Sequence, residues 1–126
     1  MERGITIDLH LVPGIPDERF VAEALGNLAA FELQSARREK LEWQVLCVTG
    51  TGPHHYRLAL RHPERRLDLG LTRELERTLD RLSDETPAEL RSRFDRAVRD
   101  GMKPVPLRNV REEVDFWQDD FWNWIG

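Results

Sequence analysis

Four side chains of the kinds that bind metal ions lie in two short stretches of the sequence. Asp8 and His10 are two residues apart, and His54 and His55 are adjacent. Residues two apart in a strand point to the same face, so Asp8 and His10 would share one face of a strand. If that strand ended near His54 and His55, the imidazoles and the carboxylate would converge as a metal site.

This convergence motivates one alternative function, a metal-assisted hydrolase or nuclease that uses Asp8, His10, His54 and His55. No Glu stands beside these histidines as a general base, and adjacent histidines in a turn ordinarily point into water. We therefore expect neither a bound metal nor another cofactor.

The glycines after the apolar run 45–48 raise the question of a phosphate-binding loop. Gly50 and Gly52 are followed by the alternating run from Tyr56 to His62. A phosphate loop needs a helix at that point, so that backbone N–H groups and the helix dipole meet the phosphate. The pattern instead predicts a β-hairpin with arms at 41–50 and 55–62, joined by a Gly-Pro turn.

Two arginines of the second arm motivate another alternative, a sensor of small anionic ligands. Arg57 and Arg61 would share the polar face of the sheet, where a guanidinium pair suits a phosphate or carboxylate. An RNA-binding sheet would show aromatic residues there for base stacking, and this face has none. The formal net charge of −4 also gives no sign of a basic surface that would bind the phosphates of a nucleic acid. We expect no nucleic-acid partner.

Residues suited to nucleophilic catalysis are poorly placed. Ser35, Ser83 and Ser92 fall on predicted helices or a helix boundary, without a Gly-x-Ser-x-Gly elbow. Cys47 stands in an apolar run with no charged neighbour, which is typical of a buried, inert thiol. The sequence therefore predicts a protein that is not an enzyme.

The elements that must position these residues can be predicted from periodicity and from helix-capping signals. In chain order they are a strand at 4–12, a helix at 17–40 with Asp17 as N-cap, the two hairpin arms, a fourth strand at 66–71, a helix from Thr72, a helix from Pro87 that ends at Gly101, an extended segment at 103–107 and a last helix at 109–125. The first hairpin arm is apolar on both faces over 45–48, which predicts that it is the central strand. Thr86 to Glu89 is the strongest local signal, a capping box with Pro at the first helical position.

These elements predict an α+β fold in a single domain spanning all 126 residues. Its centre would be a β-α-β-β unit with a three- or four-stranded, mainly antiparallel sheet, and the C-terminal helices would pack on that sheet. No run of ~20 apolar residues is present, so no membrane span is expected. No signal peptide is evident, and we expect a cytoplasmic protein.

The segment 109–126 combines aromatic and acidic residues, and three of the four Trp of the chain lie in it. One apolar stripe would face a single contact, while Phe116 and Trp122 lie on its two flanks. Aromatic residues are the usual anchors of protein interfaces. The predicted function is a small non-catalytic protein-binding module, such as an adaptor, an immunity protein or a chaperone-like protein, with a basic protein partner or self-association. The predicted partner-binding residues are Phe116, Trp117, Phe121, Trp122 and Trp124.

Overall fold

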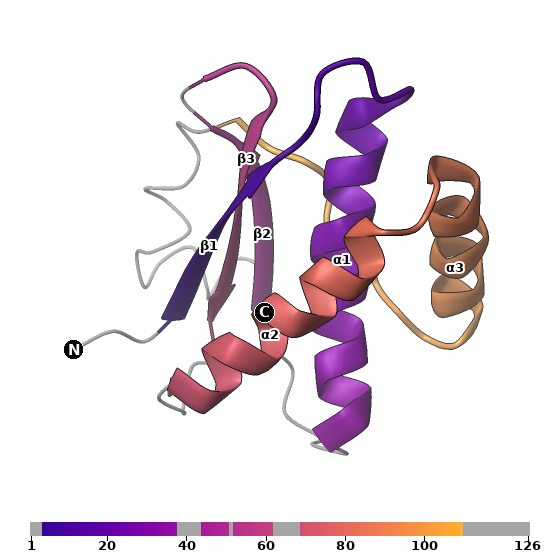
Figure 1. Ribbon diagram of the computed structural model, residues 1–126. Coiled ribbons are helices and arrows are strands. Elements are labelled where there is room, and N and C mark those ends of the chain that lie inside the picture. Colours follow the sequence, from indigo (N-terminus) through magenta and orange to yellow (C-terminus); the bar gives the residue numbers. More distant parts are fainter. Residues whose placement is uncertain (1–3, 38–43, 51, 62–68, 110–126) are drawn as a thin grey trace.

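The computed structural model describes residues 4–37, 44–50, 52–61 and 69–109. Along these ranges lie strand β1 (Gly4–His10), helix α1 (Glu18–Arg37), strand β2 (Gln44–Thr49), strand β3 (His55–Arg61), helix α2 (Leu69–Ser83) and helix α3 (Pro87–Arg99). The α+β class is confirmed. Helix α1 lies between the sheet and α3, and α2 crosses in front of α1 (Figure 1). Within the described ranges, no helix is both long enough and apolar enough to cross a membrane.

The described strands form an antiparallel sheet in the order β1-β3-β2. The prediction that the first hairpin arm is the central strand is therefore wrong, because β3 lies between the other two. The physical reason is visible at Ala59, which is 1% exposed although it points away from its buried neighbours Leu58 and Leu60. Because Ala is small and only weakly hydrophobic, the sequence gives no sign that β3 is buried on both faces at Ala59. Tyr56, Leu58 and Leu60 share the other buried face of the strand.

Helix α1 is the core helix of the described fold. Its apolar stripe is buried at Val21, Ala24, Leu25 and Leu28, whereas Phe20 and Phe31 are only partly buried. Small residues outside this stripe are buried as well, together with one polar residue; these are Ala22, Asn27, Ala29 and Ala30. Because Ala side chains are short, the sheet and two helices can approach α1 closely on several sides.

Helix α2 begins at Leu69, three residues before its predicted start at Thr72. The fourth strand predicted over 66–71 is therefore wrong for 69–71, and residues 62–68 lie outside the described ranges. Leu69 and Leu71 alternate as strand residues do. Leu71 also begins a series of leucines spaced three or four residues apart, which is the period of a helix. The buried stripe consists of Leu71, Leu75, Leu79 and Leu82. Its burial outweighs the roughly 1 kcal/mol cost of Gly70 in a helix.

Helix α3 begins with the predicted capping box. The Glu89 N–H donates to Thr86 Oγ1 over 3.1 Å, and the Thr86 N–H donates to Glu89 Oε1 over 3.2 Å. The chain leaves the helix at Gly101, whose φ of 109° is readily adopted only by glycine. Leu90 and Ala97 of this helix are buried, whereas Val98 is 42% exposed.

Helices α2 and α3 pack mainly on α1, so the expectation that they pack on the sheet is corrected. Charged side chains link the three helices. Glu32 of α1 pairs with Arg81 of α2 and lies 3.5 Å from Arg93 Nη1 of α3. Arg93 also holds Glu85, beyond the end of α2, through two bonds from its Nε of 2.8 and 3.0 Å. These pairs join α2 and α3 to α1, and α2 crosses α1 at an angle (Figure 1).

Candidate functional site

Strand pairing brings three of the sequence-predicted site residues together. His10 lies directly opposite His55 in the β1–β3 register, and the two imidazole rings stack with centroids 4.5 Å apart and planes 8° from parallel. Asp8 Oδ1 is 3.3 Å from His55 Nε2 and also 3.3 Å from Arg57 Nε. Asp8, His10, His55 and Arg57 form what we call the histidine cluster.

The carboxylate of Asp8 is held in its charged form by this cluster. Partial burial raises the pKa of Asp8, but the hydrogen bond from Arg57 and the neighbouring His55 imidazole lower it by more, so that it lies below its ordinary value. The same contact places a negative charge beside the Arg57 guanidinium. An anionic ligand would have to compete with Asp8, which does not favour the anion-sensor alternative. The side chain of Arg61 lies outside the described residues.

His54 belongs to a different group of side chains. Its Nδ1 contacts Glu18 Oε1, and Glu18 Oε2 accepts a 2.6 Å hydrogen bond from the Tyr56 hydroxyl. The bonds from Tyr56 and His54 lower the pKa of Glu18 by more than partial burial raises it. The contact attaches the hairpin tip to the first turn of α1, and the backbone of His54 is left-handed, with a φ of 59°.

The predicted convergence of Asp8, His10, His54 and His55 is thus only partial. Three of them meet in the histidine cluster, and His54 pairs with Glu18 instead. Within the described part of the chain, no three His, Cys, Asp or Glu side chains are placed to hold a metal ion. The hydrolase or nuclease alternative stays a prediction that this geometry does not support.

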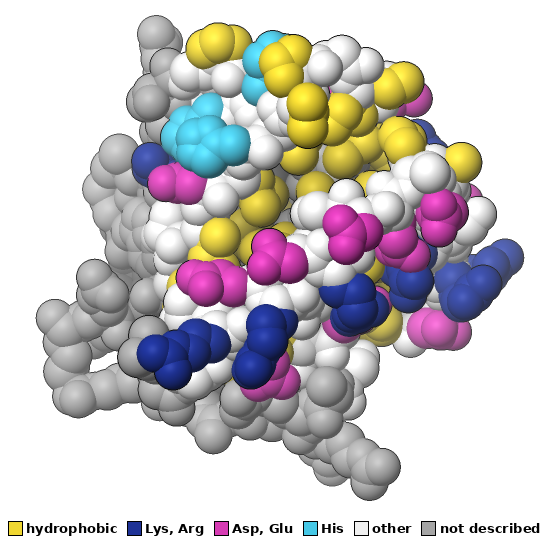
Figure 2. Space-filling model, viewed as in Figure 1, with side chains coloured by type: hydrophobic (Ala, Val, Ile, Leu, Met, Phe, Trp, Pro, Cys, Tyr) yellow, Lys and Arg dark blue, Asp and Glu magenta, His cyan; other side chains and the backbone are white. Residues whose placement is uncertain are grey.

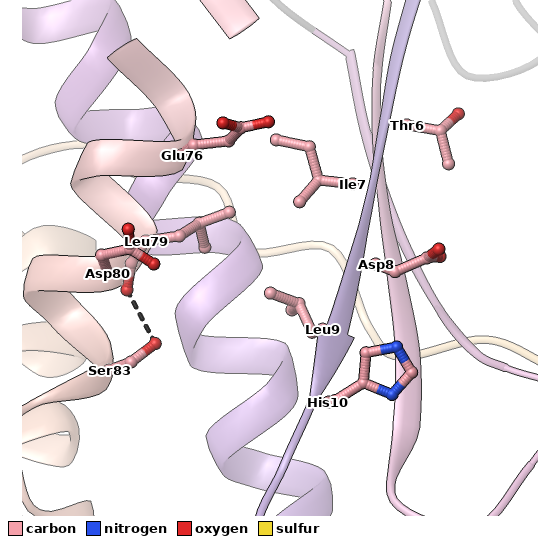
Figure 3. Close-up of a pocket in the computed structure, with 9 residues that line it drawn as sticks. All are labelled: Thr6, Ile7, Asp8, Leu9, His10, Glu76, Leu79, Asp80 and Ser83. Carbon is pink, nitrogen blue, oxygen red and sulfur yellow. Dashed lines mark hydrogen bonds between the residues drawn. The ribbon is translucent and has the colours of Figure 1, made fainter. Parts of the chain in front are cut away.

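A groove lies between β1 and α2. Its lining residues, which define the β1–α2 groove, are Thr6, Ile7, Asp8, Leu9, His10, Glu76, Leu79, Asp80 and Ser83. Ile7 and Leu9 point toward α2 and Leu79, whereas Thr6 and Asp8 point to the other side of the strand (Figure 3). The space-filling view shows apolar side chains between the two elements, with acidic and basic side chains side by side along α2 (Figure 2). The groove therefore has Ile7, Leu9 and Leu79 at its base, while most of its exposed lining is polar and its charged lining residues are acidic.

Strand β1 lies at one edge of the described sheet, with β3 as its partner on the other side. The N–H of Leu11 donates to the carbonyl of His54 over 2.9 Å, one step beyond the end of the paired register. In an antiparallel ladder such bonded pairs alternate with unbonded ones. Ile7 and Leu9 consequently bond to β3, while the backbone N–H and C=O groups of Thr6, Asp8 and His10 point away from β3.

The charges in the lining of the groove have one sign. Glu76 and Asp80 are exposed on α2, and Asp8 is 53% exposed on β1. No Lys or Arg is among the lining residues. The Ser83 hydroxyl is occupied, since it donates to the carbonyl of Leu79 over 2.7 Å. The lining of the groove therefore carries carboxylates and no basic side chain, while Arg73, Arg77 and Arg81 of α2 lie outside the lining.

The predicted partner-binding residues Phe116, Trp117, Phe121, Trp122 and Trp124 lie outside the described residues, so their role stays a prediction. The β1–α2 groove was not predicted from the sequence. Two sequence patterns come from its lining. They are the alternating polar residues Thr6, Asp8 and His10 along one strand, and the four-residue spacing of Glu76 and Asp80 along one helix. Neither pattern indicates a groove until α2 is placed beside β1.

Comparison of this chain with known protein families, with curated proteins and with solved structures finds no match.

Proposed function

We propose that this protein is a small non-catalytic protein-binding module and that the β1–α2 groove is one of its binding surfaces. The observation that carries the proposal is the edge position of β1 beside a groove that has Ile7, Leu9 and Leu79 at its base and acidic residues in its lining. An edge strand presents a row of N–H and C=O groups that can pair with another chain. Natural proteins commonly use such an edge, flanked by a groove, for peptide recognition.

The charge of the groove supports a basic partner. Carboxylates of Glu76 and Asp80 line it, and opposite charge speeds encounter and selects among partners. The overall net charge of −4 has the same sign. Adaptor, immunity or chaperone-like roles in the cytoplasm all fit this proposal. The aromatic-acidic segment 109–126 is proposed as a further interaction surface of the same module.

Site-specific photo-crosslinking tests the proposal. A benzophenone amino acid is introduced at Ser83, in the groove, and at Ser92, which is exposed on α3 away from it. Irradiation in cells of the source organism should give a discrete protein adduct from Ser83 and none from Ser92. Absence of an adduct at Ser83, or identical adducts from both positions, would show that the groove is not a protein-binding surface.

A further inference from the structure

We infer that the β1–α2 groove takes an extended, basic peptide segment of the partner as an additional strand beside β1. This inference rests on the proposed function and specifies how the groove would be used. Three features carry it: the direction of the β1 backbone groups, the side chains that an added strand would meet, and the charge of the lining.

The backbone of β1 offers three outward positions to an added strand. The N–H and C=O groups of Thr6, Asp8 and His10 point away from β3, by alternation from the Leu11–His54 bond. Alternate residues of a strand are about 6.7 Å apart, which is the spacing at which a second extended chain repeats its own donors and acceptors. A short extended peptide would therefore satisfy all three positions.

The side chains of such a peptide would alternate between two environments. Every second side chain would enter the groove beside Ile7 and Leu9 and in front of Leu79. A Lys or Arg suits this position because its aliphatic stem can lie on the leucines while its charged end reaches Glu76 or Asp80. The intervening side chains would lie on the face of Asp8 and His10.

A second copy of this chain fits the groove less well. Pairing of two β1 strands would bring the carboxylates of Glu76 and Asp80 from both copies toward one another. The segment Gly4–His10 contains no Lys or Arg that could neutralise them. Like charges held close together oppose association, so the geometry favours a basic segment of a different protein.

Fluorescence anisotropy with a defined peptide tests the inference on the full chain. The probe is a fluorescein-labelled, alternating Lys-Val-Lys-Val-Lys-Val peptide, and the comparison peptide carries Glu in place of Lys. The basic peptide should bind at least about tenfold more tightly than the acidic one at low salt. Equal affinity for the two peptides, or no binding of the basic one, would overturn the inference.

Methylation of the peptide backbone distinguishes strand addition from simple charge attraction. One peptide is N-methylated at its Val residues, and a second at its Lys residues. Only one alternate set of residues in an added strand directs its N–H groups to β1. Methylation of one set should therefore abolish binding, and methylation of the other should leave it largely unchanged. Equal binding by both methylated peptides would overturn strand addition.

Protein variants locate the peptide. The double variant Glu76→Gln with Asp80→Asn should weaken binding of the basic peptide about tenfold, as expected for the loss of two exposed ion pairs. The control Asp95→Asn with Asp100→Asn removes the same charge beside or on α3 and should leave affinity nearly unchanged. Equal weakening by both double variants would mean that the peptide responds only to net charge, against the inference.

Failure of the inference and failure of the proposed function give different results. If Ser83 crosslinks to a partner but the peptide series is negative, the groove binds protein by another mode. If the Ser83 adduct is a dimer of this chain, the occupant is a second copy and the assignment to a basic partner is wrong. If neither experiment detects binding, both proposals fail.

Discussion

The hydroxyl of Tyr56 donates a 2.6 Å hydrogen bond to Glu18, which lies 38 residues earlier in the chain. Tyr56 is 4% exposed on the central strand, so this bond satisfies a hydroxyl that water cannot reach. Glu18 stands in the first turn of α1, where a negative charge is favoured by the helix dipole. The pair therefore joins the sheet to α1 near the hairpin tip, and it positions the end of β1.

The first prediction concerns the pH dependence of this contact. Because the pKa of Glu18 is lower in the folded protein than in an unfolded chain, its carboxylate stabilises the fold above its ordinary pKa. That contribution is lost as the pH falls through the lowered pKa. Glu18→Gln should reduce the thermal midpoint at pH 7, and the difference from the wild type should shrink below about pH 4. Thermal unfolding followed by circular dichroism across this pH range measures it.

The matched control for this series is Glu76→Gln, which neutralises an exposed carboxylate of α2. Its difference from the wild type should change little over the same pH range. A Glu18→Gln difference that stays constant from pH 7 to acid would mean that Glu18 does not supply the pH-dependent stability.

A second prediction concerns the central position of β3. Leu58 is 0% exposed and its strand pairs on both sides. Leu58→Ala should cost about 2–5 kcal/mol of unfolding free energy, as buried Leu→Ala changes usually do. Urea denaturation measures this cost. A loss below about 1 kcal/mol would show that the strand is peripheral.

The elements that sequence reasoning predicted well are those fixed by local chemistry. β1 was readable from the period of two between Ile5 and Leu9, and α3 from its capping box at Thr86. The errors arose where contacts between residues distant in the chain determine the secondary structure or the burial. The start of α2 was missed because Leu69 and Leu71 fit a strand period as well as a helix, and only packing on α1 distinguishes them. The burial of Ala59 likewise depends on neighbours distant in the chain.

In the candidate site too, the local features were predicted and the long-range contacts were not. The alternation in β1 correctly placed Asp8 and His10 on one face, but their meeting with His55 required the antiparallel register. The pairing of His54 with Glu18 was not predictable from local sequence, because the two residues lie 36 positions apart in the chain. The groove needs both the strand order and the position of α2, and neither follows from local sequence.

A third prediction tests the edge geometry of β1 by proline substitution. The N–H of Thr6 points away from β3, whereas that of Ile7 donates into the ladder, by alternation from the Leu11–His54 bond. Proline removes an N–H, and it is tolerated in edge strands where that group faces outward. Thr6→Pro should fold with a modest loss of stability, and Ile7→Pro should be far more destabilising. Chemical denaturation of the two variants compares them, and the reverse ranking would contradict the derived register.

A fourth prediction concerns the glycines of the hairpin turn. A Cβ at Gly50 would overlap the ring of His55, whereas a Cβ at Gly52 would meet nothing within 4 Å. Gly50→Ala should therefore displace His55 from its stack with His10 and cost about 1–3 kcal/mol, the usual range for overpacking. Gly52→Ala is the matched control and should be nearly neutral. NMR shifts of the two imidazoles and denaturation curves check this, and equal effects of the two substitutions would contradict it.

The last prediction concerns the segment 109–126, of which residues 110–126 lie outside the described residues. At about 100° per residue, a helix there would place Val114, Trp117 and Phe121 on one stripe, with Phe116 and Trp122 on opposite flanks. One flat contact cannot bury both flanks, and clustered exposed aromatic rings mark interaction surfaces. Phe116→Ala combined with Trp122→Ala should therefore weaken association with a partner, or between copies, while the stability of the monomer changes little.

The control for this double variant is Trp117→Ala, on the stripe that should pack against the core. It should cost about 3–5 kcal/mol of unfolding free energy, as large buried aromatic residues usually do. Sedimentation and crosslinking measure association, and urea denaturation of the monomer measures stability. If the Phe116 and Trp122 variant loses several kcal/mol of stability and leaves every association unchanged, the segment belongs to the core. The aromatic surface would then drop out of the proposed function, and the β1–α2 groove would have to account for partner binding by itself.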